Sequence, residues 1–397
     1  MNITVIMLAL CQAMLMTTVS LVLSSSALVG VQLSSPNLAT VPLAVQYLST
    51  MLLMFPVSRL METHGRKNIF IAGALLGAFG LGFAAAGIRL GNFVLFSAAG
   101  FLIGAFNAVG QYYRFAAAEA VPVERKSEAI SMTLTGGVLA AMAGPVLAKW
   151  TREALAPPFF ASFLALIVVA LLGALFASRL KMPQSAIIEI EGSRRPLAEI
   201  ARQPKFQLAV AGGVISYSVM NLLMTATPLA MMCSTHDFDR TATVIQWHLV
   251  AMFAPSFFTG KLIQRIGVLR VMLIGCLLYL ASIGISLTGL EFVHFQFGLI
   301  LLGIGWNFLY VGATSLLTET YRKEEKAIIQ GVNDTAVFLA VTVATLFSGK
   351  LVNSLGWQGI NLYAALPIVL LSAWIFRYMT QRVKSELTAR GSEYSKT

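Results

Sequence analysis

Three polar side chains recur at helical spacing within one otherwise apolar stretch of the sequence. Asn107, Gln111 and Arg114 are separated by four and three residues, so they share one face of a helix. A guanidinium beside two amides can bind a carboxylate, a phosphate or a polarised carbonyl. Arg114 could instead be structural, reaching the end of its helix or pairing with Glu119.

A second ionisable side chain, Asp334, also stands in an apolar stretch, residues 327–349, within the segment Gln330–Thr335. Ionisable groups are costly in such surroundings and are candidates for proton transfer. Asp334 could therefore take up and release a proton. Two other interpretations remain open, a permanent ion pair with a basic residue and a solvated position at the mouth of a cavity.

Aromatic and amide side chains recur in the other apolar stretches. Together they suit a planar solute with hydrogen-bonding groups, although each one alone is more often a contact between helices. The candidates for a substrate cavity are Gln12, Gln46, Asn107, Gln111, Arg114, Tyr217, Asn221, Trp306, Asn307 and Tyr310.

The elements that carry these side chains are expected to be membrane-spanning helices. Of the 397 residues, 57% are hydrophobic and 11% are charged, and the mean hydropathy is +0.78. Soluble proteins carry about 25% charged residues, and disorder requires low hydrophobicity. Transmembrane strands would show alternating segments of about ten residues, whereas this chain has long apolar runs. The sequence therefore predicts an all-α polytopic membrane protein.

Twelve apolar runs are long enough to cross a bilayer, which takes about 20 residues. The sequence predicts an N-terminal six-helix bundle over residues 1–178, a linker loop over 179–206, a C-terminal six-helix bundle over 207–378 and a tail over 379–397. The predicted spans are 4–28, 39–58, 69–88, 92–118, 129–150, 158–178, 207–231, 242–263, 268–289, 295–318, 327–349 and 357–377.

The basic residues predict the orientation of these spans. If both termini are cytoplasmic, 22 of the 28 lysines and arginines lie in cytoplasmic segments and five lie outside. Cytoplasmic loops carry an excess of Lys and Arg, so this orientation is favoured. The net charge of +11, which in a soluble protein would suggest nucleic-acid binding, is explained by the same loops.

The two halves of the chain repeat each other at an offset near 200 residues. The segments Ser58–Lys67 and Gly260–Arg270 follow the second and eighth spans, and both place a basic residue, then Leu, then Gly at the same spacing. Further on, Glu119 is echoed by Glu319. Duplicated six-span halves place a binding site at their interface, near the middle of the membrane.

These loops resemble a signature of the major facilitator superfamily, Gly-x-Leu-x-Asp-Arg-x-Gly-Arg-Lys/Arg. The first copy departs from it at Ser58 and Thr63, and the second has Gln264 at the acidic position. The resemblance implies that the loops latch the two halves in one state and release them in another; the alternative is that their charges only set the topology. The matching residues are Leu60, Glu62, Gly65, Arg66, Lys67, Gly260, Leu262, Arg265 and Gly267.

The resemblance implies a twelve-span secondary transporter of the bacterial inner membrane, in which the fourth span lines a central cavity. It would move a small organic solute by alternating access, driven by protons, with Asp334 and Arg114 as coupling residues. A drug or metabolite efflux antiporter is the alternative, and a non-transporting membrane sensor or scaffold is a third. The segments Gln111–Glu119 and Trp247–Gly260 are similar to a bacterial subgroup, some of whose members are proposed riboflavin carriers.

Several kinds of chemistry have no support in the sequence. It contains no phosphate-binding glycine loop, no nucleophile elbow and no cluster of residues with metal-ligand spacing. We therefore expect no enzyme activity, no metal and no cofactor. The expected partners are a small-molecule substrate and the lipid bilayer, without nucleic acid, and the expected state is a monomer.

Overall fold

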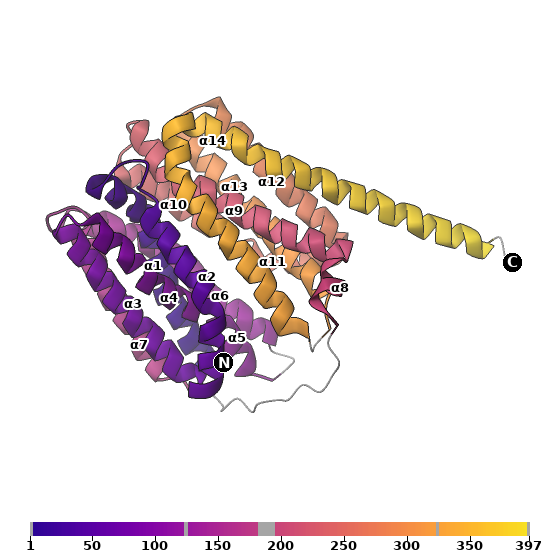
Figure 1. Ribbon diagram of the computed structural model, residues 1–397, viewed down its shortest axis with the longest axis horizontal. Coiled ribbons are helices and arrows are strands. Elements are labelled where there is room, and N and C mark those ends of the chain that lie inside the picture. Colours follow the sequence, from indigo (N-terminus) through magenta and orange to yellow (C-terminus); the bar gives the residue numbers. More distant parts are fainter. Residues whose placement is uncertain (1–2, 123–125, 182–194, 323–324, 395–397) are drawn as a thin grey trace.

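The computed structural model describes residues 3–122, 126–181, 195–322 and 325–394 of the chain (Figure 1). Within these ranges the regular elements are all helices. Nine of them are long and apolar enough to cross a membrane. Large apolar side chains such as Phe79, Leu366 and Phe376 are exposed, while Ser24, Asn221 and Asn361 are buried. Exposed apolar and buried polar side chains are what a helix bundle in lipid requires.

The predicted spans of the first half are all present as helices. The fourth span is divided at Gln111 and Tyr112, where a turn separates two helices, although both residues keep backbone angles in the right-handed helical region. The helices are α1 (Ile3–Leu33), α2 (Val41–His64), α3 (Arg66–Arg89), α4 (Phe93–Gly110), α5 (Tyr113–Glu119), α6 (Lys126–Thr151) and α7 (Phe160–Ser178).

The second half follows the same plan. Its eighth span is divided at Pro255, which lacks a backbone N–H, and the last two spans form one element with a kink at Gly356. The helices are α8 (Leu197–Ala201), α9 (Pro204–Cys233), α10 (Phe238–Phe253), α11 (Ser256–Ile266), α12 (Val268–Thr288), α13 (Phe292–Thr318) and α14 (Lys326–Tyr394). The predicted fold class and its twelve spans are confirmed.

Helices pack within each half through small residues. In the first half α1 lies against α6 and α7, and α4 lies against α2 and α3; in the second, α9 lies against α13 and α14, and α12 against α13. At Gly303 of α13 a Cβ atom would lie 2.7 Å from the His248 carbonyl oxygen of α10. Such contacts show that backbones approach too closely for any side chain at these positions.

The two halves meet along α2 and α14, α6 and α10, and α1 and α9. Hydrogen bonds join them near one end of the bundle. Asn353 donates to Asn37 at 2.9 Å, and Lys149 donates to the Thr243 hydroxyl at 2.9 Å. We call this end the closed end. Asn37 precedes α2 and Gly65 follows it. Thr243 lies near the start of α10 and Gly267 follows α11, so both glycines lie towards the other end of the bundle.

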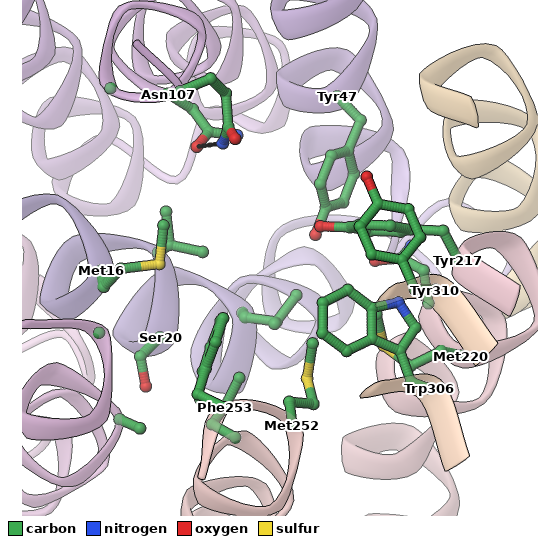
Figure 2. A pocket seen from close by; sticks show the side chains of 18 of the residues that line it. Met16, Ser20, Tyr47, Asn107, Tyr217, Met220, Met252, Phe253, Trp306 and Tyr310 are labelled. Atoms are coloured by element: carbon green, nitrogen blue, oxygen red, sulfur yellow. Dashed lines mark hydrogen bonds between the residues drawn. The ribbon is translucent and has the colours of Figure 1, made fainter. Parts of the chain in front are cut away.

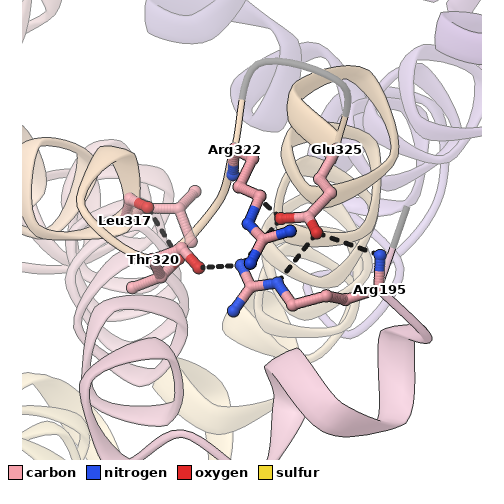
Figure 3. A network of polar contacts seen from close by, with 5 residues as sticks. All are labelled: Arg195, Leu317, Thr320, Arg322 and Glu325. Atoms are coloured by element: carbon pink, nitrogen blue, oxygen red, sulfur yellow. Dashed lines mark hydrogen bonds and ion pairs between the residues drawn. The ribbon is translucent and has the colours of Figure 1, made fainter. Parts of the chain in front are cut away.

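A cluster of polar contacts fixes the segment after the linker to the second half (Figure 3). Arg195 donates to Glu325 through Nε at 2.8 Å, Nη2 at 2.7 Å and its backbone N–H at 3.1 Å. Nη2 also donates to the Thr320 carbonyl at 3.1 Å. The Arg195 guanidinium, together with the Arg322 N–H, lowers the pKa of Glu325 to about 2. A second ion pair, between Lys205 and Glu319, joins the start of α9 to the C-terminal end of α13.

The linker itself, residues 182–194, lies outside the described residues. Lys181, which directly precedes it, is held by the first half, because its carbonyl accepts a hydrogen bond from the Thr4 hydroxyl at 3.2 Å. The sequence allows an amphipathic surface helix or a flexible linker over Leu197–Gln207. The structure shows a single helical turn, α8, with Ile200 buried, followed directly by α9.

Candidate functional site

A cavity lies between the two halves and is lined by helices of both (Figure 2). The lining follows helical spacing, because Gln12, Met16 and Ser20 are one turn apart on α1. On α9 the lining residues are Tyr217, Asn221 and the two methionines that flank Asn221. Helices α2, α4, α5, α6, α10, α13 and α14 complete the wall.

The first half contributes a polar wall. Asn107 is buried and donates to the Thr50 hydroxyl at 3.3 Å, and Gln111 donates to the side-chain oxygen Oδ1 of Asn107 at 3.4 Å. Arg114 lines the cavity one turn further on. The three side chains predicted to share a face do so, because the turn between α4 and α5 does not reverse the chain. Tyr112 donates to the Met54 carbonyl at 2.7 Å and holds this turn against α2.

The second half contributes an aromatic wall. Trp306 and Tyr310, one turn apart on α13, are stacked with ring centroids 5.0 Å apart and an interplanar angle of 13°. Tyr217 meets both rings edge-on, at 5.4 Å from Trp306 and 5.3 Å from Tyr310. Phe253 meets Trp306 edge-on at 6.2 Å. Figure 2 shows Trp306, Tyr310 and Tyr217 on one side of the cavity, Asn107 and Met16 on the other, and Phe253 below and between them.

Opposite charges face the same cavity from the two halves. Arg114 on α5 and Asp334 on α14 both line it, and the two interact electrostatically. Asn333 donates to the Asp334 carboxylate at 3.1 Å. A solute between the halves would therefore meet a cation on one side and a carboxylate on the other. In the described part of the chain, no group of three His, Cys, Asp or Glu residues is placed to hold a metal ion.

Two predicted cavity residues lie away from the cavity wall. Gln46 is buried in α2 against α4, where Gly104 faces its carbonyl oxygen. Asn307 is 1% exposed and points from α13 to the break between α10 and α11. It donates to the Met252 carbonyl and the Ser256 hydroxyl, each at 2.7 Å, and accepts from the Thr259 hydroxyl at 2.7 Å. These polar groups bridge neighbouring helices.

Several cavity residues were not predicted from the sequence. What they share is a lack of charge or amide groups, so the search for polar side chains passed over them. Helical spacing was the signal that could have found half of them, because Met16, Met220, Met224 and Phe338 lie one turn from a predicted residue. They include Met16, Tyr47, Met54, Met220, Met224, Met252, Phe253 and Phe338.

The two predicted gating loops have the same backbone geometry. Gly65 has φ and ψ of 79° and 145°, and Gly267 has 89° and 150°. Glycine tolerates the positive φ that each turn requires. The repeat seen in the sequence is thus also present in the backbone.

The side chains around these turns differ in exposure. Leu60 and Arg265 are exposed, while Arg66, Lys67 and Leu262 are half-buried. Gly260 lies in the middle of α11, in an open position. The side chain of Glu62 lies outside the described part of the structure.

Comparison with known proteins identifies the family. The chain is 41% identical to the riboflavin transporter RfnT of Brucella anthropi over 371 residues, which covers 92% of this chain and 93% of that protein. It is 27% identical over 337 residues to the uncharacterized MFS-type transporter YdeG of Bacillus subtilis, covering 79% and 77%. YddS of the same organism, also an uncharacterized MFS-type transporter, is 24% identical over 371 residues, covering 88% and 85%.

The sequence profile of the Major Facilitator Superfamily matches residues 5–254 and again 209–394. The two matches together extend over nearly the whole chain, and they agree with its duplicated halves and twelve spans. The chain therefore belongs to the Major Facilitator Superfamily and is a multi-pass membrane transporter of small molecules.

Proposed function

We propose that this chain carries riboflavin, or a flavin closely related to it, across a bacterial inner membrane by alternating access. The observation that carries the proposal is the stack of Trp306 and Tyr310 facing the amide wall of Asn107 and Gln111 in one cavity. The similarity to RfnT, named as a riboflavin transporter, supports the choice of substrate.

The cavity complements the chemistry of a flavin. The isoalloxazine ring system is planar, with one apolar edge and one edge that carries carbonyl groups and an N–H. Flat rings bind well against indole and phenol faces. Amides and a guanidinium can donate hydrogen bonds to ring carbonyls and can meet the hydroxyls of the ribityl chain.

In this proposal Arg114 and Asp334 couple transport to protons. Because they line the same cavity from different halves, their attraction favours closure of the halves around it. Protonation of Asp334 removes the carboxylate charge and weakens that attraction. A proton taken up on one side of the membrane and released on the other would then bias the direction of the cycle.

We further propose a topology and a conformational state. With both termini cytoplasmic, Arg66, Lys67 and Arg265 lie on the cytoplasmic side and the closed end faces outward. The hydrogen bonds of the closed end, such as Lys149 to Thr243, then seal the outer side. The loops around Gly65 and Gly267 would latch the halves in the opposite state. Residues 1–178 and 207–378 act as the two moving bodies, joined by residues 179–206.

The proposal is tested by expressing the chain in a bacterial riboflavin auxotroph that lacks a riboflavin importer of its own. The measurement is the uptake of radiolabelled riboflavin. The chain should support uptake, and Trp306→Ala should weaken apparent affinity by about 5- to 150-fold, because stacking on an aromatic ring contributes about 1–3 kcal/mol. Trp150→Ala is the matched control, because Trp150 is 79% exposed on the surface of the bundle. Normal expression without uptake or riboflavin binding would refute the substrate; export of riboflavin from loaded cells would favour efflux.

A further inference from the structure

Methionine is strongly enriched in the wall of the cavity. The protein has 17 methionines among 397 residues, so a wall of 24 residues would hold about one by composition. It holds five, namely Met16, Met54, Met220, Met224 and Met252. The excess points to a property of the cavity itself, since the other 12 methionines are spread over the remaining 373 residues.

These methionines surround the aromatic wall from both halves. Met220 and Met224 flank Asn221 on α9, and Met252 precedes Phe253 on α10. Figure 2 shows Met220 and Met252 beside Trp306, and Met16 of α1 across the cavity from it. A ring that lies against Trp306 and Tyr310 would therefore have thioether side chains around its edges.

Methionine has a distinct physical character in such a position. Its side chain is unbranched, with three rotatable bonds and a polarisable sulfur, so it reshapes around different outlines and contacts aromatic ring edges favourably. The stacked rings of Trp306 and Tyr310 have no such freedom, because they pack against Tyr217 and Phe253. The cavity thus combines one rigid flat wall with flexible edges.

We propose that these five methionines, which we call the methionine rim, let the cavity accept planar ring systems that differ in their edge substituents. Resting on the proposed flavin transport, the inference is that the chain carries a group of ring-modified flavins in addition to riboflavin. The flat wall selects for planarity, and the methionine rim tolerates changes of outline. Stiffening the methionine rim should narrow the range of substrates.

The test replaces three methionines of the rim by isoleucine, whose β-branched side chain is stiff about χ1. The variant is M16I/M220I/M252I, and the matched control is M142I, because Met142 is exposed on the outside of the bundle. Purified proteins are titrated with riboflavin, its 8-dimethylamino analogue and its 7,8-didemethyl analogue, with binding followed by quenching of flavin fluorescence. Uptake competition in cells gives the same ratios independently.

We expect the wild type and M142I to bind both analogues within about tenfold of riboflavin. In the triple variant the affinity for the bulkier analogue should fall, relative to riboflavin, by about tenfold or more, because a misfit of one methylene in a rigid pocket changes affinity by about 10- to 200-fold. Equal ratios in the triple variant and the wild type would overturn the inference, as would a wild type that binds riboflavin but rejects both analogues.

A second set of variants guards against misfolding. If the triple variant does not elute as a single species in size-exclusion chromatography, M16I and M252I are titrated singly, and unchanged ratios in both would again overturn the inference.

Thermal unfolding with planar tricyclic compounds that are not flavins separates the two proposals. If wild type ignores flavins but binds several such tricyclics, and the isoleucine variants bind fewer, flavin transport is wrong while the role of the methionine rim stands.

Discussion

Two asparagines at equivalent positions of the repeat should respond differently to replacement by alanine. Asn307 makes three hydrogen bonds of 2.7 Å to α10 and α11, whereas Asn107 makes two of 3.3 and 3.4 Å and lines the cavity. Hydrogen bonds between membrane helices contribute about 0.6 kcal/mol each on average. Asn307→Ala should therefore reduce the free energy of unfolding by about 2 kcal/mol, and Asn107→Ala by about 1 kcal/mol or less.

The effects on transport should be reversed. Asn107→Ala removes an amide from the cavity wall, so the KM for uptake should rise, whereas Asn307→Ala leaves the wall intact and its KM should stay near the wild-type value. Stability is measured by reversible unfolding of the purified protein in mixed detergent micelles, and KM by initial uptake rates normalised to folded protein at the membrane. A raised KM with unchanged stability for Asn307→Ala would refute the assignment of this side chain to helix packing.

Three further predictions concern charge, the linker contacts and helix packing. Asp334→Asn should abolish the dependence of uptake on a pH gradient while the affinity for substrate in detergent changes by less than about tenfold; persistent gradient dependence would contradict the coupling role. The pKa of Glu325 is lowered from 4.5 to about 2, so its stabilising contribution is complete above about pH 4.5 and is lost as the pH falls towards 2. Trypsin should therefore cleave the bond between Arg194 and Arg195, whose N–H donates to Glu325, no faster at pH 6 than at pH 8 once allowance is made for the activity of trypsin. Cleavage should be faster in Glu325→Gln at both pH values, and cleavage of that variant at the wild-type rate would count against the contact. Gly303→Ala should destabilise the protein by about 1–3 kcal/mol through overpacking, whereas Gly284→Ala, with no atom within 4 Å of its Cβ, should be neutral or stabilising, and equal effects would contradict the packing in the structure.

The architecture could be predicted because it depends on quantities that a sequence displays directly. The length of each apolar run determines where a helix can cross the bilayer, and the spacing of Asn107, Gln111 and Arg114 determines that they share a face. The equivalence of Gly65 and Gly267 followed from the repeat and reappears as matching dihedral angles. The roles given to the gating loops and to the coupling pair stay predictions.

The rest of the site could not be predicted, for two physical reasons. Inside a membrane, apolar side chains face lipid as readily as they face a cavity, so Met220 and the exposed Met142 look alike in the sequence. Asn307 has the residue type and repeat position of Asn107, yet it turns to the break at Pro255, where hydroxyl and carbonyl groups of two helices converge. Only the three-dimensional arrangement distinguishes the two.

The contacts at the two ends of the linker have a consequence for how the polypeptide could be divided. Lys181 is held by its own half through Thr4, and Arg195 is held by the other half through Glu325. The fourteen steps of chain between them reach at most about 46–50 Å when fully extended. A cut within 182–194 would leave both anchors on their proper bundles, so two separately encoded chains should assemble into a working transporter. In the intact protein the linker would then act through effective concentration, keeping the two bundles within reach of each other.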